Sequence, residues 1–188
     1  IGRRWNKSEL ALRESEELYR TLVENASDVV YWTDENGYFT FVNPAGIRIT
    51  GYEKEELIGK HYPTLIRPDL REEAIKFFGR QFVKGIKNAY SEYPILTKEG
   101  REVWLGQNTQ LIVEDGHVKG FQAVARDITE RRQMKEALEK RETMLNEMGT
   151  IAKIGGWEFD SESQKQVWTK EVYCIHEVDE NYEPTVSK

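Results

Sequence analysis

The sequence predicts an α+β fold: a five-stranded antiparallel sheet with its helices on one face, flanked by an N-terminal and a C-terminal helix. Strand-like runs, rich in β-branched and aromatic residues, occur first as a pair and later as a group of three. Helical segments occupy the chain between the two groups. Short turns connect neighbouring strands, which favours antiparallel pairing with segregated helices.

The first helix is expected in the N-terminal flanking segment, residues 1–26. From Ser8 to Ala26 the chain has no Gly or Pro, and it carries Leu18 and Leu22 at helical spacing. This composition and this period are typical of an amphipathic helix.

A β-hairpin is expected next. Two strand-like runs, VVYWTD and YFTFVN, flank the Asn36-Gly37 pair. The pair predicts a two-residue turn in which both residues have positive φ. Asn43-Pro44 follows, and a short helix should begin there because Asn is a good N-cap and Pro tolerates the first helical position.

The middle of the chain is predicted to be helical, and the three remaining strands follow it. Glycines break residues 45–67 into brief helical turns, whereas residues 69–83 predict one longer helix with an apolar stripe. The stripe contains Leu70, Ala74, Phe77, Phe78 and Phe82. The strands are expected at residues 90–97, 103–113 and 118–128, joined by turns that contain glycine.

Residues 129–150 are expected to form an exit helix. Its apolar residues Met134, Leu138, Leu145 and Met148 alternate in steps of four and three, interrupted by Arg141. This spacing predicts a short coiled-coil seam. A solvated single helix is the alternative that the spacing leaves open.

The last segment, residues 151–188, repeats the strand, hairpin and helix order of residues 29–50. Such self-similarity at a fixed interval indicates an internal repeat. A piece of this length cannot bury a core of its own. We therefore expect the truncated start of a second domain of the same kind.

Composition excludes several classes of function. The formal net charge is −6 and no basic stripe stands out, which argues against nucleic-acid binding. No apolar run reaches the roughly 20 residues of a membrane helix, so this segment should make no membrane contact. No signal peptide opens the sequence, and Cys174 is the single cysteine, expected to be a small buried residue. A cytoplasmic location fits, and any membrane attachment would lie elsewhere in a longer protein.

The junction between the last strand and the exit helix carries three polar residues, Asp127, Thr129 and Glu130. Asp127 and Glu130 have the spacing of a capping box, and Thr129 is an alternative cap. Either cap lets the helix begin where the strand ends, without a flexible spacer. From the spacing alone, an ordinary cap and a joint that transmits a signal are equally good interpretations.

Several stretches resemble the PAS sensory domains: SEELYRTLVENASDVVYWTDENGYFTFVNPAGIRITGYEKEELIGK, YPTLIRPDLREE, KEGREVWL and GFQAVARDITERRQMKEAL. They cover Ser15 to Leu138, and the most specific element is Asp127-Ile128-Thr129. The resemblance implies a PAS sensory domain over residues 27–128 and a second one that begins near residue 151. It also implies a bacterial or archaeal signal-transduction protein, with several PAS domains ahead of a histidine kinase. It favours a signal-transfer role for Asp127, Thr129 and Glu130.

Alternation along the strands predicts which side chains face the core. If these faces point inward, the core contains an amide and hydroxyls, with small residues leaving room beside them. Buried polar groups need partners, so we expect a ligand pocket here, although the groups can also satisfy one another. The candidate lining residues are Tyr31, Phe41, Tyr93, Ile95, Leu105, Gln107, Thr109, Phe121, Ala123 and Ala125.

The resemblance to PAS domains limits which cofactors this chain is expected to bind. Flavin-binding PAS relatives of the light-sensing type carry a reactive Cys in a helical Asn-Cys-Arg motif, and residues 45–59 contain no Cys. Haem-binding relatives use a His on the long central helix, and residues 69–83 contain none. We expect neither group, and we expect His61 to be an exposed loop residue. No histidines show metal-ligand spacing. A small organic ligand stays open, and its identity is unknown.

The function expected is a non-catalytic sensory and dimerisation module that signals through its exit helix to a downstream kinase. No set of nucleophile, base and orienting residue is evident. The alternatives are an interaction scaffold with a filled core, or the input domain of a diguanylate cyclase or phosphodiesterase. A homodimer should form through the flanking helices, with Trp32 on the outer sheet face covered by the N-terminal helix.

Overall fold

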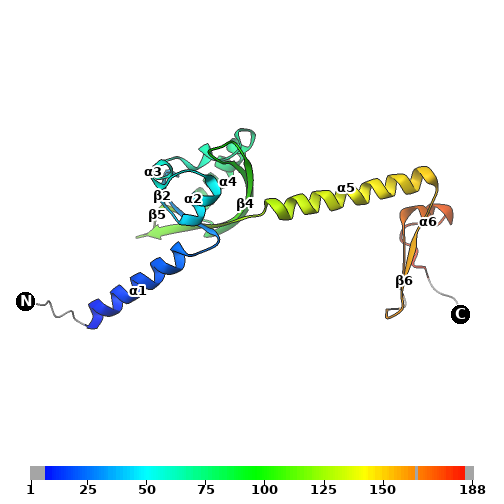
Figure 1. The fold of residues 1–188 in the computed structure, drawn as a ribbon, viewed down its shortest axis with the longest axis horizontal. Coiled ribbons are helices and arrows are strands. Elements are labelled where there is room, and N and C mark those ends of the chain that lie inside the picture. Colours follow the sequence, from blue (N-terminus) through cyan, green and yellow to red (C-terminus); the bar gives the residue numbers. More distant parts are fainter. Residues whose placement is uncertain (1–6, 164, 185–188) are drawn as a thin grey trace, which may run out of the picture. The chain divides into compact units, whose positions relative to one another are not determined.

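The computed structural model describes residues 7–163 and 165–184 (Figure 1). The chain divides into two compact units, the first ending at Glu130 and the second beginning at Arg131. Each unit is considered by itself.

The first unit has the predicted order of elements. They are α1 (Lys7–Glu24), β1 (Val29–Asp34), β2 (Phe39–Val42), α2 (Pro44–Thr50), α3 (Lys54–Leu57), the 3-10 turns η1 (Tyr62–Thr64) and η2 (Pro68–Leu70), α4 (Arg71–Lys84), β3 (Asn88–Leu96), β4 (Glu102–Glu114) and β5 (His117–Asp127). The five strands form one antiparallel sheet in the order β2-β1-β5-β4-β3. The predicted α+β class is therefore confirmed.

The core lies between the sheet and the helices that separate β2 from β3. Ala74 and Phe78 of α4 pack in one cluster with Tyr93, Leu111 and Phe121 of the sheet. A second cluster joins Leu57 and Leu65 of the helical segment to strand residues such as Val103. Both clusters use the same face of the sheet, so the helices lie on one face, as predicted.

The turn between β1 and β2 differs from the prediction. Gly37 has a φ of 84°, whereas Asn36 does not adopt a positive φ. The Asp34 carboxylate instead accepts hydrogen bonds from the amides of Asn36 at 3.0 Å and Tyr38 at 2.9 Å. Asp34 therefore organises a longer turn, and the expected two-residue turn is wrong.

Asn43 is the predicted N-cap of α2, and its side chain accepts from the amide of Gly46 at 3.2 Å. It also accepts from the amide of Val30 at 3.0 Å and donates to the carbonyls of Val23 at 3.1 Å and Asp28 at 3.0 Å. One buried side chain thus ties the end of α1 to the start of β1 and of α2.

The second unit contains most of α5 (Thr129–Ala152), a hairpin of β6 (Trp157–Asp160) and β7 (Lys165–Trp168), and α6 (Lys170–Ile175). The strand, hairpin and helix order is as predicted. That it begins a second domain stays a prediction. Cys174 is exposed, so its expected burial is wrong. The apolar seam residues of α5, Met134, Leu138, Leu145 and Met148, are all exposed.

Candidate functional site

The inner face of the sheet carries the polar core residues that alternation predicts. On β4, Val103, Leu105, Gln107, Thr109 and Leu111 are all buried. Val113 is next in this alternation, but it is 52% exposed, and the β4–β5 register shifts between Ile112 and Val113. The prediction of this face therefore holds until the strand nears its turn.

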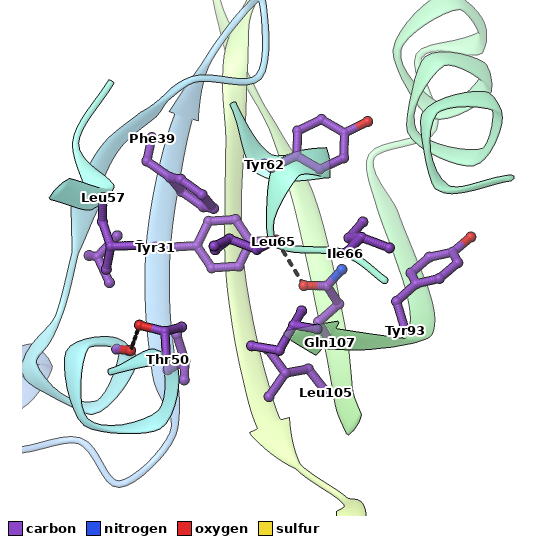
Figure 2. Close-up of a pocket in the computed structure, with 14 residues that line it drawn as sticks. Tyr31, Phe39, Thr50, Leu57, Tyr62, Leu65, Ile66, Tyr93, Leu105 and Gln107 are labelled. Atoms are coloured by element: carbon purple, nitrogen blue, oxygen red, sulfur yellow. Dashed lines mark hydrogen bonds between the residues drawn. The ribbon is translucent and has the colours of Figure 1, made fainter. Parts of the chain in front are cut away.

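A cavity of about 50 Å³ lies between this face and the helical segment (Figure 2). Five predicted residues line it: Tyr31, Tyr93, Ile95, Leu105 and Gln107. The helical segment supplies walls that strand alternation could not predict, namely Gly46, Thr50, Leu57, Tyr62, Leu65 and Ile66. At this volume the cavity has room for a few water molecules.

A second hollow of about 10 Å³ adjoins the cavity and shares Tyr31 and Tyr62 with it. Two further predicted residues, Thr109 and Phe121, line this hollow. Ala123 and Ala125 are buried on the inner face, but they line neither hollow. Because these two side chains on β5 are small, larger side chains on the neighbouring strands β1 and β4 occupy the space beside them.

Phe41 does not line the cavity, and its predicted place there is wrong. Trp32 pairs with Phe41 but Thr33 pairs with Phe39, so Thr40 is an extra residue in β2. This bulge reverses the alternation. Phe39 therefore lines the cavity, while the Phe41 ring lies 5.0 Å from the Trp32 ring on the outer face. Trp32 is 43% exposed, so α1 does not cover it as expected.

The polar groups of the cavity bind one another. The Tyr31 hydroxyl donates to Gln107 Oε1 at 2.8 Å, as Figure 2 shows. Gln107 Nε2 donates to Ser91 Oγ at 3.4 Å. Burial raises the pKa of Tyr31 well above its usual range, with a further contribution from Tyr62. Both phenols are neutral at physiological pH, since burial and the nearby Tyr93 raise the pKa of Tyr62 to about 12.

Gln81 of α4 is a buried polar residue that the sequence interpretation missed. Its Oε1 accepts from Thr109 Oγ1 at 3.0 Å, and its Nε2 donates to the Thr109 carbonyl at 3.2 Å. Gln81 follows Ala74 and Phe78 at helical spacing, so it lies on the buried side of α4. The period alone could have found it, whereas Phe82, assigned to the apolar stripe, is 37% exposed.

The junction to α5 is held by the backbone of Trp104 on β4. Only Ile128 separates the end of β5 from the start of α5. The Ile128 amide donates to the Trp104 carbonyl at 2.8 Å, and the Trp104 amide donates to Thr129 Oγ1 at 2.9 Å. Asp127 accepts from the Thr129 amide at 2.9 Å, while Glu130 lies in the first helical turn. We call these contacts the Trp104 clamp.

Gly106 makes room for the Trp104 clamp. A Cβ atom at this position would lie 2.6 Å from the Tyr90 hydroxyl and 3.3 Å from Ile128 Cγ2. Ile128 is accordingly buried, at 7% exposure. The last strand therefore passes into α5 through a packed, hydrogen-bonded residue.

His61 is half-buried, which corrects the expectation of an exposed loop residue. It forms an isolated bridge with Tyr38, and the two rings lie 5.0 Å apart. Among the described residues, no group of three or more His, Cys, Asp or Glu side chains is placed to hold a metal ion. Within the same part of the chain, no helix combines the length and apolarity needed to cross a bilayer.

A five-stranded antiparallel sheet, with its helices on one face and a cavity between them, defines the architecture, and the comparisons identify its family. Residues 17–128, more than half of the chain, match the family described as PAS fold. The chain therefore belongs to the PAS family. The structure of a PAS domain from Colwellia psychrerythraea is 23% identical with a TM-score of 0.57, covering 62% of this chain and 98% of that one.

Two relatives are sensor kinases. This chain is similar to the sensor histidine kinase TmoS of Ectopseudomonas mendocina, at 27% identity over 81% of this chain and 16% of TmoS. It is also similar to the signal transduction histidine-protein kinase AtoS of Escherichia coli, at 42% identity over 35% of this chain and 11% of AtoS. The chain thus spans less than a fifth of the length of these relatives.

Proposed function

We propose that this chain is a non-catalytic sensory module that binds a small organic molecule in the cavity and signals through α5. The observation that carries the proposal is the Trp104 clamp. Leu105 and Gln107 line the cavity, and Trp104 on the same strand holds the first turn of α5. One strand thus contacts both the ligand space and the exit helix.

The mechanism follows from the hydrogen bonds of Gln107. The Tyr31 hydroxyl donates a hydrogen bond to Gln107 Oε1 at 2.8 Å. A ligand that donates to the same oxygen competes with Tyr31 for it. Loss of that bond frees β4 and β1 to shift relative to one another, because Gln107 and Tyr31 join the two strands across β5. Asp127, Thr129 and Glu130 then pass the shift of β4 into α5.

The partners in this proposal are a second copy of the chain and an output domain. The exposed apolar residues of the flanking helices, such as Leu18 and Leu22 on α1 and Leu138 and Leu145 on α5, would meet in a homodimer. The output domain would be a histidine kinase within a longer, multi-PAS two-component protein. A diguanylate cyclase or phosphodiesterase is the second candidate. The segment would act in the cytoplasm, without contact to nucleic acid or membrane.

The scaffold alternative is favoured by a specific observation: Gln107 and Thr109 already have protein partners. Native mass spectrometry of the full chain, purified and sprayed without denaturant, distinguishes the sensory module from the scaffold. We expect a dimer that carries a small organic molecule. A dimer of unliganded chains would instead support the scaffold.

The same measurement tests the dimer. Leu138→Lys combined with Leu145→Lys places charges in the apolar seam, so it should give monomers at micromolar concentration. Asn146→Lys, which adds a charge on the same helix outside the seam, is the matched control and should stay dimeric. Monomers of the unmodified chain would contradict dimerisation through α5.

A further inference from the structure

Thr33 is a buried residue whose hydroxyl has no hydrogen-bond partner among the described residues. It lies on β1, is 4% exposed, and lines the second hollow with Tyr31, Tyr62 and Thr109. Thr109 on the same face differs, since its hydroxyl has two acceptors in reach: Gln81 Oε1 at 3.0 Å and the Ala89 carbonyl oxygen at 3.2 Å. Of the two threonines that line this hollow, Thr33 is thus the one whose buried hydroxyl has no partner among the described residues.

A buried hydroxyl without a partner is unfavourable, and native proteins satisfy most such groups. The second hollow, at about 10 Å³, is the size of one small polar group or one water molecule. It therefore has room for a single atom that bonds Thr33 Oγ1.

The second hollow shares lining residues with two larger spaces. Tyr62 lines it, lines the inner cavity of about 50 Å³, and also lines a surface groove of about 220 Å³. Phe78 and Phe121 line both the second hollow and the groove. Because the Tyr31 and Tyr62 side chains are walls of both the second hollow and the inner cavity, a molecule that bonds Thr33 and extends an apolar part into the inner cavity has to displace one of them.

We propose that Thr33 is the polar anchor of the ligand, and that the ligand is a small uncharged molecule with an apolar body and one hydrogen-bonding group. The inference rests on the function proposed for the cavity. No side chain that lines the inner cavity or the second hollow is charged at neutral pH. An ion would therefore be buried without a counter-charge, which is strongly unfavourable.

Two probes of similar size test the anchor: 1-butanol has a hydroxyl, and 1-chlorobutane has chlorine in its place. Each probe is titrated into the full chain, and the NMR chemical shifts of residues around Tyr31 and Thr33 give the affinity of that probe. Thr33→Val removes the hydroxyl at nearly constant volume, so it should weaken 1-butanol binding by about fivefold and leave 1-chlorobutane unchanged. Thr33→Ser keeps the hydroxyl, so the difference in affinity between 1-butanol and 1-chlorobutane should be the same as in the unmodified chain.

Thermal unfolding without probe gives an independent readout. Thr33→Val should raise the unfolding midpoint, because it removes an unsatisfied buried hydroxyl. Thr109→Val, the matched control, should lower the midpoint because it breaks existing bonds. A lowered midpoint for Thr33→Val would overturn the anchor by revealing a partner, such as a fixed water.

The outcomes separate the anchor from the cavity itself. Equal binding of both probes to the unmodified chain and to Thr33→Val would overturn the anchor while the sensory cavity stands. Shifts confined to the groove residues would also overturn it. No shift with either probe in any variant would contradict both the anchor and the proposed function.

Discussion

Replacing Gly120 with alanine is expected to lower the free energy of unfolding by about 4 kcal/mol. Gly120 lies on β5 opposite Asp34 of β1, with a φ of 152°. A Cβ atom there would lie 1.9 Å from the Thr33 carbonyl oxygen and 3.0 Å from the Asp34 carbonyl carbon. Both contacts are with backbone, so no side-chain rotation relieves them, and β1 must move away from β5.

Urea unfolding followed by circular dichroism measures this effect. Gly79→Ala is the matched control, since a Cβ on this glycine of α4 meets no atom within 4 Å. Alanine should stabilise the helix there by about 1 kcal/mol. A Gly120→Ala protein as stable as Gly79→Ala would contradict the close β1–β5 approach.

Replacing Asn43 with alanine is expected to lower the free energy of unfolding by about 3 kcal/mol. The side chain is completely buried and makes the four hydrogen bonds that join α1, β1 and α2. Alanine leaves the Val30 amide without this acceptor and the Val23 and Asp28 carbonyls without this donor.

The same unfolding assay includes two further variants. Asn43→Asp keeps the cap oxygen but buries a carboxylate against the Val23 and Asp28 carbonyls, so it should destabilise the chain at least as much as alanine does. Asn36→Ala, at an exposed turn position, should change stability by less than about 0.5 kcal/mol. Equal effects at positions 36 and 43 would refute the proposed importance of the buried cap.

The order of elements in the first unit could be predicted because local signals agree there. Period-two runs marked the strands, glycines marked the turns, and Asn43-Pro44 marked the start of α2. The pairing of β1 with β5, the first strand with the last, has no local signal. It depends on closing a long loop, which nearby residues do not specify.

The candidate site was predicted in part. Alternation placed Gln107 and Thr109 on the inner face, because β4 is regular there. It failed at Phe41, since one extra residue in β2 exchanges the faces and leaves no mark in composition. Walls from the helical segment, such as Leu57 and Leu65, depend on tertiary packing, which strand periodicity does not describe.

Amide hydrogen exchange at the Trp104 clamp tests the account most directly. If β4 holds the start of α5, the exchange rates of the Trp104 and Ile128 amides should lie within about tenfold of the rates of amides in the central β4–β5 ladder. Thr129→Val should speed exchange at Trp104 by about fivefold, because the acceptor of that amide is lost. Exchange at Ile128 as fast as at Glu99, in the exposed β3–β4 turn, would contradict a firm connection between sheet and helix.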